Sequence, residues 1–530
     1  MSTGGSSFDD WCREAVDRFL QSVLVVDDNA TLAGPSPVDL NLDPPAQAFH
    51  EQEGDEESTE EPTEPPERRL DVKTLTDEFA KAGLVCGVMK PDQDSPSAET
   101  VVAVARRADI ILLDWRLDDR GERASEIVKR LAECDGMRLI AIYTSAGGLD
   151  RIAESLAACL NEGDRDGVPR YVHEPDSFRV TGDGLTIEVY AKEGSQGDEA
   201  ESERLILPQD IPGQLIDDFV RTTHGIVPTA AIATIGALRV DTSKVLGLLG
   251  ADLDPGYLGH RMLLSDPDES GEHLIDLISS ELRAVIEDNK LVRKAVGQAV
   301  IDMYVDQTEP GELPLDVLKE VLTVGLTNQE AREKLGPLRA VQDAKLLKGN
   351  GSRTRYLTGG DAEQALEADR RFAVKLSIRT PSRAAPRLGL GTLVKNGEKQ
   401  YLICLQPECD SVRLTGARYF PFLPLESAEF KGQDLLIKEP DDWIGLKIVR
   451  SPYELRMLRF SPDPDTRTAM VRPEGDGFVF ITNDGEGIEF IAQLRVAHSR
   501  DLAHQLATKI GRVGLDQSEV QRLWQKHGAA

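Results

Sequence analysis

Acidic and hydroxyl side chains follow several short apolar runs in the N-terminal part of the chain. The stretch Ser22 to Asp28 reads SVLVVDD, so one aliphatic run ends on two adjacent carboxylates. A later run, DIILLDW, ends on Asp114, and another, IAIYTS, includes Thr144. Adjacent carboxylates repel one another, but a hard divalent cation such as Mg²⁺ binds their oxygens and relieves that repulsion. A further carboxylate could then act as a nucleophile, and a hydroxyl could bond a transferred phosphoryl oxygen.

Alternating strands and helices indicate how these side chains could meet. Apolar runs such as SVLVV, LVCGVM, DIILLDW and RLIAIYTS are typical of buried strands. Segments with helical spacing, such as LDVKTLTDEFAKAG and ASEIVKRLAECDG, separate them. This order predicts a parallel sheet, whose strands share their carboxyl ends at one edge. We therefore expect the acids and Thr144 to lie at that edge, where such folds place their sites.

This layout resembles the receiver domain of two-component response regulators. That family has an acid pair after the first strand, a phosphoacceptor Asp after the third, and Thr or Ser after the fourth. The resemblance implies a receiver-like (flavodoxin-like) α/β fold with a doubly wound, five-stranded parallel sheet. It also implies the following roles: Asp114 as phosphoacceptor, Thr144 as switch hydroxyl, and Asp27, Asp28, Asp114 and the backbone carbonyl of Arg116 as Mg²⁺ ligands.

The fifth strand departs from the family pattern, which has a Lys there, usually followed by Pro. One candidate, VPRYVHEPDSF, offers Glu174 and a proline, but a carboxylate would repel a phosphoryl group. The other, LTIEVYAKEG, offers Lys192 without a proline, and an ammonium suits the chemistry. We prefer Lys192, so that 164–184 becomes an insertion with a hairpin around TGDG. If Glu174 holds the position, the domain is a degenerate pseudo-receiver that acts as a protein-binding scaffold.

Changes in composition divide the chain into three predicted domains. A receiver-like domain spans 1–225, with an acidic insertion at 34–68 that we expect to be disordered. Within it, Glu51 to Glu67 contains nine acids, three prolines and no basic residue. Amphipathic runs then predict an all-helical module over 226–350. Short strands between Gly, Pro, Asn and Asp turns predict a β-rich α+β domain over 370–530, with a helical tail.

The three-part layout is similar to bacterial "response receiver domain" proteins of predicted conflict or phage-defence systems. Segments that carry this resemblance are RTTHGIVPTAAIATIGALR, LICLQPECDSVRL and FPFLPL. It implies a protein partner, a histidine-kinase-like ATPase, because the chain has no ATP-binding glycine boxes. We expect a phosphoacceptor regulator and not a turnover enzyme, with the output activity of the C-terminal domain left open.

Composition excludes some classes of partner. The formal net charge of -31 argues against nucleic acid, because phosphate contacts need clustered Lys and Arg. No apolar run of about 18 residues predicts a membrane span, and the N-terminus lacks the pattern of a secretory signal. We therefore expect a cytoplasmic protein.

An enzyme is the remaining alternative. A haloacid-dehalogenase-like phosphatase also places a nucleophilic Asp after its first strand. That family has a second Asp two residues later, whereas Asn29 stands two residues after Asp27 here. We rank the phosphatase below the regulator for this reason.

Overall fold

The computed structural model describes residues 7–31, 70–91 and 97–511, with short gaps in the last range. The gaps are 119, 135, 163–168, 183, 194, 196–198, 309–312, 328, 345, 348–352, 381–383, 429–432, 440–441 and 476. The predicted disordered insertion and the last part of the predicted helical tail lie outside the described residues. The chain divides into two compact units, Met1–Thr308 and Glu309–Ala530. Their boundary falls inside the predicted helical module, and the three-domain division stays a prediction.

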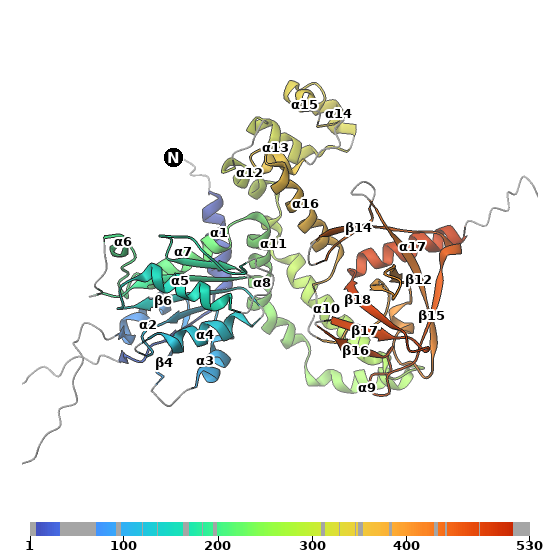
Figure 1. Ribbon diagram of the computed structural model, residues 1–530, viewed down its shortest axis with the longest axis horizontal. Coiled ribbons are helices and arrows are strands. Elements are labelled where there is room, and N and C mark those ends of the chain that lie inside the picture. The colour runs from blue at the N-terminus through green and yellow to red at the C-terminus, as the bar shows by residue number, and fades with distance from the viewer. Residues whose placement is uncertain are drawn as a thin grey trace, which may run out of the picture. The chain divides into compact units, whose positions relative to one another are not determined.

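A seven-stranded sheet forms the centre of the first unit (Figure 1). In spatial order its strands are β4 (Val85–Met89), β1 (Ser22–Val26), β5 (Ile110–Leu113), β6 (Arg138–Thr144), β9 (Leu185–Ala191), β8 (Arg179–Gly182) and β7 (Val172–His173). The first five run parallel, as predicted. The prediction of five strands in all was wrong, because two antiparallel strands extend the edge beyond β9. Strands β8 and β9 pair antiparallel up to Gly182 and Leu185, which confirms the predicted hairpin.

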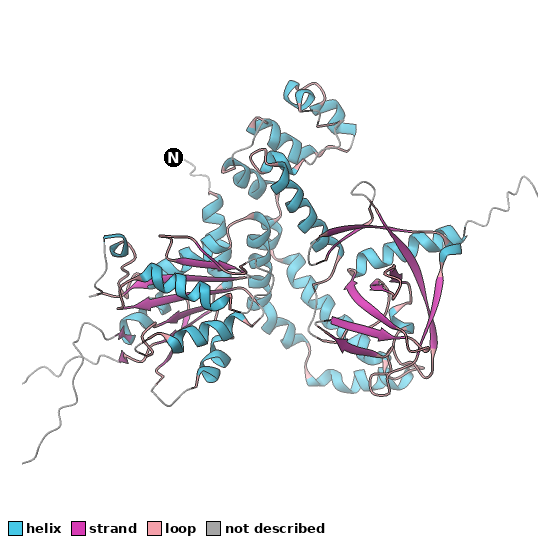
Figure 2. Cartoon of the chain, in the orientation of Figure 1, coloured by secondary structure: helices cyan, strands magenta, loops and turns pink. Residues whose placement is uncertain are grey.

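Helices cover both faces of this sheet (Figure 2). One face packs against α1 (Phe8–Phe19), α2 (Val72–Lys81) and α7 (Ile211–Thr222), and the other against α3 (Ala98–Ala105), α4 (Glu122–Ala132) and α5 (Leu149–Leu160). In β1, Val23 and Val25 join the first core while Leu24 and Val26 join the second. Successive side chains of a strand point to opposite faces, so a strand buried on both sides is apolar throughout.

The N-terminal helix α1 is anchored by its ends and its apolar face. The Ser7 hydroxyl accepts from the Asp10 backbone N–H at 3.1 Å, and the Asp10 carboxylate accepts from the Ser7 N–H at 2.8 Å. This reciprocal capping box satisfies two donors that a helix start leaves free. Phe8 and Trp11 are fully buried in the core that α1 shares with α2 and α7.

Further elements of the first unit follow or interrupt the sheet. They are β2 (Ala30–Thr31), β3 (Leu70–Asp71), α6 (Glu199–Ser202), α8 (Ile226–Leu248), a 3₁₀ turn (Ala251–Leu253), α9 (Asp254–Leu263), α10 (Glu269–Asp288), α11 (Lys290–Ala295) and α12 (Gln298–Asp306). Strands β2 and β3, which stand before and after the acidic insertion in the sequence, pair in parallel. Helices α8, α11 and α12 pack beside α1, which joins this helical segment to the receiver-like core.

The second unit combines short helices with an antiparallel, nine-stranded sheet. Its helices are α13 (Leu315–Val324), α14 (Gln329–Leu335), α15 (Arg339–Asp343), α16 (Ala362–Ser377) and α17 (Val496–Gly511), with 3₁₀ turns at Thr354–Leu357, Glu408–Asp410 and Pro452–Glu454. Its strands are β10 (Thr392–Lys395), β11 (Tyr401–Cys404), β12 (Arg418–Ser427), β13 (Leu435–Lys438), β14 (Trp443–Ile448), β15 (Arg456–Phe460), β16 (Val471–Glu474), β17 (Gly477–Ile481) and β18 (Gly487–Gln493). The predicted β-rich C-terminal region is therefore confirmed.

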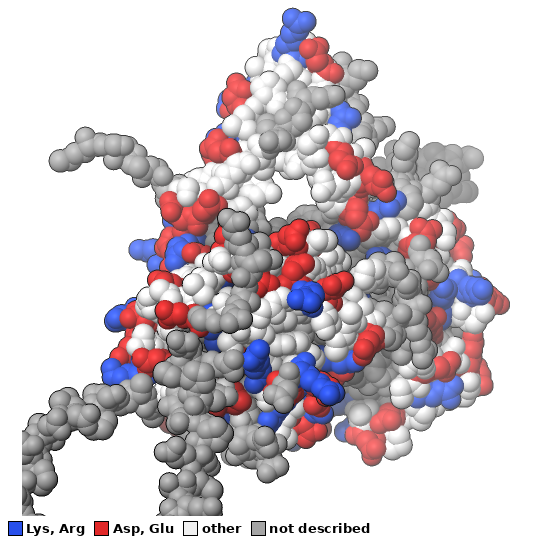
Figure 3. Space-filling model, turned by 60° about the vertical axis from the view of Figure 1, so that its left-hand side comes forward, with Lys and Arg blue, Asp and Glu red and all other residues white. Residues whose placement is uncertain are grey.

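Charged side chains of both signs cover the face shown in Figure 3, with lysines and arginines in small groups among the acids. None of the described helices combines the length and apolarity that crossing a membrane requires.

Candidate functional site

The site residues lie at the ends of four neighbouring strands of the parallel sheet, β1, β5, β6 and β9. The backbone N–H of Asp27 donates to Met89 O at 3.1 Å, and that of Asp114 donates to Val26 O at 2.9 Å. The backbone N–H of Lys192 donates to Thr144 O at 2.8 Å. Each of these bonds continues the hydrogen-bond pattern of the sheet by one residue beyond a strand end. The sheet therefore fixes the backbone positions of Asp27, Asp114 and Lys192. The prediction that these residues lie at one edge of the sheet is confirmed.

Three carboxylates gather at this edge. Asp27, Asp28 and Asp114 each offer an oxygen, and these oxygens lie within 4.8 Å of one another. Asp27 and Asp114 are 2% and 5% exposed, while Asp28 is half-buried. Such a group of close, poorly solvated carboxylates is costly unless cations or hydrogen bonds offset the charge.

Lys192 supplies the cation of the site. Its Nζ lies 2.6 Å from Asp27 Oδ2 and 2.6 Å from Asp114 Oδ2, and the side chain is 7% exposed. Burial alone would lower the pKa of Lys192, but Asp114 and Asp27 together raise it above its usual value. The ammonium also lies 5.4 Å from the centre of the Tyr143 ring, a cation–π contact that the sequence analysis missed.

Backbone and amide donors complete the hydrogen bonding of the acids. The Asn29 N–H donates to Asp27 Oδ1 at 2.7 Å, and Asn29 Nδ2 donates to Asp28 Oδ1 at 3.1 Å. The Arg116 N–H donates to Asp114 Oδ1 at 3.0 Å. The sequence pattern alone did not predict these bonds from Asn29.

The charge balance of the site fits a divalent cation. Burial, and then the charges of Asp114 and Asp27, raise the pKa of Asp28 to about 6. Burial likewise raises the pKa of Asp114, against the opposing effect of Lys192. When all three acids are ionised, one ammonium leaves two negative charges uncompensated. Oxygen ligands with a surplus of two negative charges match the preference of Mg²⁺, so Asp27, Asp28 and Asp114 are the residues that would hold it.

Thr144 lies at the same edge, as predicted. It is fully buried at the end of β6, and its Oγ1 accepts from the Ala146 N–H at 3.1 Å. Among the described hydrogen bonds, this hydroxyl bonds its own loop and none joins it to Asp114. The expected carbonyl ligand, Arg116, is an exposed residue in the loop after β5.

The loop between β5 and α4 turns tightly beside Trp115. Gly121 has φ +73°, and a Cβ placed there would lie 2.2 Å from Trp115 Cε2. A side chain at this position would meet both backbone strain and a ring, so glycine is required. The turn brings Trp115, the residue after the candidate phosphoacceptor, against the start of α4.

Glu174 lies away from the acid cluster. It is exposed in the turn between β7 and β8, the outermost strands of the sheet, and its carbonyl accepts from Ser177. The structure thus places Lys192, and not Glu174, beside Asp114.

Comparison with known proteins agrees with this geometry. Residues 19–197 match the family described as "Response receiver domain". This segment is a response receiver domain. No curated protein and no solved structure matches the chain. The receiver domain contains every residue of the acid cluster together with Lys192 and Thr144, whereas the match does not extend to the helical segment or the second unit. The resemblance of the whole chain to defence-system proteins stays a prediction.

Proposed function

We propose that this chain is a response-regulator-like signalling protein whose Asp114 accepts a phosphoryl group from a partner histidine-kinase-like ATPase. The observation that carries the proposal is the position of Lys192 Nζ, 2.6 Å from both Asp114 Oδ2 and Asp27 Oδ2, within the receiver domain. A degenerate receiver has no need of an ammonium at the end of β9. The proposal describes a regulator that is phosphorylated once per cycle, and not an enzyme that turns over a substrate.

The chemistry assigned to Asp114 is nucleophilic attack on phosphorus. A carboxylate oxygen forms the new P–O bond, the bond between phosphorus and the donor breaks, and the donor keeps that electron pair. Lys192 favours the ionised carboxylate before the reaction and supplies a positive charge beside the phosphoryl oxygens afterwards. Mg²⁺ bound by Asp27, Asp28 and Asp114 would neutralise charge on the acid cluster and on the incoming group.

Thr144 and Lys192 link the phosphoryl group to the rest of the unit. The Thr144 hydroxyl has only a weak local bond to exchange for one to a phosphoryl oxygen. Lys192 directly follows β9, whose Tyr190 packs in the same core as α7. A shift of Lys192 would thus act on the strand and helix that lead to α8. We propose that this route controls the helical segment and the C-terminal unit.

Incubation with acetyl phosphate and Mg²⁺, followed by intact-mass analysis, tests the proposal. The wild-type chain and the control Asp77→Asn, which changes an exposed acid on α2, should each gain the mass of one phosphoryl group. Asp114→Asn should gain none, and Asp28→Asn or chelation of Mg²⁺ should slow the reaction. Equal phosphorylation of Asp114→Asn and Asp77→Asn would refute the assignment.

A further inference from the structure

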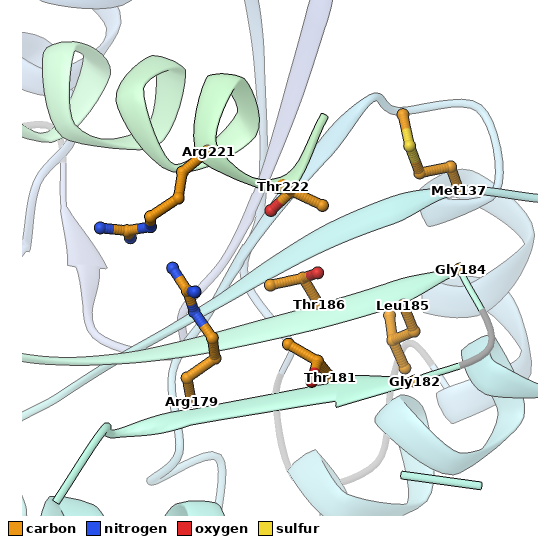
Figure 4. Close-up of a pocket in the computed structure, with 9 residues that line it drawn as sticks. All are labelled: Met137, Arg179, Thr181, Gly182, Gly184, Leu185, Thr186, Arg221 and Thr222. Atoms are coloured by element: carbon orange, nitrogen blue, oxygen red, sulfur yellow. The ribbon is translucent and has the colours of Figure 1, made fainter. Parts of the chain in front are cut away.

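A pocket lies in the receiver domain, away from the acid cluster. The pocket in Figure 4 has a volume of about 460 Å³ and forms where β6 and β9 begin. Thr144 and Lys192, by contrast, lie where these strands end. The residues that line it are Met137, Arg179, Thr181, Gly182, Gly184, Leu185, Thr186, Arg221 and Thr222. Its volume is in the range of small-molecule sites.

Two arginines face each other at this pocket. Figure 4 shows the guanidinium groups of Arg179, from β8, and Arg221, from α7, pointing toward one another. Both donate to Glu188 Oε1, which lies 2.5 Å from Arg179 Nε and 3.1 Å from Arg221 Nη2. Glu188 is fully buried on β9, so it holds the two guanidiniums in place from beneath. In the described part of the chain, Nη1 and Nη2 of Arg179 and Nε and Nη1 of Arg221 take no hydrogen-bond partner.

The charges around the pocket leave a positive surplus. Arg204 Nη2 also bonds Glu188, at 2.8 Å, and Arg221 also bonds the buried Asp218. The described ion pairs of this cluster thus join three guanidiniums to two carboxylates. A surplus guanidinium charge, already oriented by buried acids, favours an anionic ligand.

Thr186 adds a hydroxyl group to the wall of the pocket. It is 5% exposed, lines the pocket, and has no described hydrogen-bond partner for its hydroxyl. The hydroxyl is therefore available to donate a hydrogen bond to a ligand oxygen in the cavity. Figure 4 places Thr186 beside Thr222 and next to the arginine pair, while Met137 and Leu185 lie at the other end of the pocket.

We propose that this pocket binds a small phosphate ester. The phosphate oxygens take the free N–H groups of Arg179 and Arg221 and the Thr186 hydroxyl. Two guanidiniums from different elements suit the three terminal oxygens of a phosphate better than the two oxygens of a carboxylate. The organic group packs against Met137 and Leu185, which gives the ester an advantage over inorganic phosphate.

Calorimetric titration of the full chain tests this site with three probes: phenyl phosphate, inorganic phosphate and benzoate. An excess of chelator keeps divalent metal from the acid cluster, so that the cluster does not attract anions. We expect phenyl phosphate to bind more tightly than inorganic phosphate, and inorganic phosphate more tightly than benzoate. Benzoate binding as tightly as phenyl phosphate, or no binding of phenyl phosphate, would overturn the proposal.

Two variants assign the binding to this pocket. Thr186→Val keeps the shape of a buried residue and should weaken phenyl phosphate binding about tenfold, because it removes one bond to a charged oxygen. Arg221→Lys should weaken it by at least as much, because a lysine has no guanidinium fork. The control Arg283→Lys changes an exposed arginine on α10 and should bind like the wild type.

Circular dichroism checks that each variant folds. If Arg221→Lys does not fold, Thr186→Val decides: affinity equal to that of the control refutes the proposal.

Discussion

Two buried ionic clusters in the receiver domain each include a residue in or directly after strand β9, and these two residues carry opposite charges. At the end of the strand, Lys192 is the single cation among three carboxylates. Four residues earlier, Glu188 accepts hydrogen bonds from three guanidiniums. Glu188 and the acids bonded to Lys192 are all nearly inaccessible to solvent. When the charges of the described pairs are counted, the first cluster keeps a negative surplus and the second keeps a positive surplus.

That difference indicates which ligand each cluster can accept. Burying an ion is costly unless a partner neutralises it, so each surplus charge identifies the missing partner by its sign. The acid cluster lacks positive charge, which a divalent metal supplies. The arginine cluster lacks negative charge, which a phosphate ester supplies. The two clusters lie at different parts of one sheet, and the predictions below separate them.

Glu188→Gln should have the largest effect on stability. It removes the one carboxylate that three guanidiniums share, and breaking a buried ion pair costs about 3–5 kcal/mol. Urea denaturation of the full chain, followed by circular dichroism, measures the loss. The control Glu287→Gln breaks an exposed pair on α10 and should cost under about 0.5 kcal/mol. Equal midpoints for the two variants would show that the cluster does not act as a unit.

Lys192→Met should destabilise the metal-free protein by about 2–3 kcal/mol, because two buried carboxylates lose their cation. The loss is smaller than for Glu188→Gln because Asp114, whose pKa burial already raises, can take up a proton. Added Mg²⁺ should stabilise this variant more than the wild type, in the same denaturation experiment. Lys129→Met, at an exposed pair with Glu162, is the control. A Mg²⁺ effect no larger in Lys192→Met than in Lys129→Met would contradict the shared role of metal and lysine.

Tyr190→Phe and Tyr143→Phe compare a charged acceptor with a neutral one. The Tyr190 hydroxyl donates to the buried carboxylate of Asp218, and the Tyr143 hydroxyl donates to the Ile206 carbonyl at 2.8 Å. Both rings are 3% exposed. Thermal unfolding should show a loss of about 1.5–3 kcal/mol for Tyr190→Phe and about 1 kcal/mol for Tyr143→Phe. The reverse order would argue that Asp218 is not ionised in the cluster.

The pH dependence of Mg²⁺ binding should follow Asp28. Its pKa in the folded protein, about 6, lies above the value of 3.8 expected when unfolded. In the absence of metal, the contribution of Asp28 to the free energy of unfolding therefore falls as pH rises from 3.8 through about 6. A bound cation stabilises the ionised form of Asp28 more than the protonated form. Below about pH 6, Mg²⁺ must displace a proton, so affinity should fall by up to about tenfold per pH unit. Calorimetry at several pH values tests this, and Asp28→Asn should flatten the profile. An unchanged affinity at about pH 5 would contradict the assignment.

The acid cluster was easier to predict from the sequence than the arginine cluster. SVLVVDD and DIILLDW place their acids directly after apolar strands, and parallel strands bring such positions together whatever the loops do. The choice of Lys192 over Glu174 likewise depended on recognising a strand, LTIEVYA. The role of Thr144 as a switch and the metal itself remain predictions.

The arginine cluster had only one sequence signal, a glutamate in the middle of that strand. Alternation of apolar and polar residues in LTIEVYA is typical of a strand with one face in solvent, but all seven residues of β9 are buried because helices cover both faces. The partners of Glu188 lie 9, 16 and 33 residues away on three different segments. Only the packing of α7 and the β8–β9 hairpin, neither fixed by local pattern, brings them together.

Chemical localisation of the acyl phosphate tests the central claim most directly. The full chain is treated with acetyl phosphate and Mg²⁺, reduced with borohydride, which converts a phosphorylated aspartate to homoserine, and digested for sequencing by mass spectrometry. Our account predicts homoserine at position 114 in the wild type, and none when Mg²⁺ is chelated. Homoserine at another aspartate, or none at all in the folded protein, would contradict it.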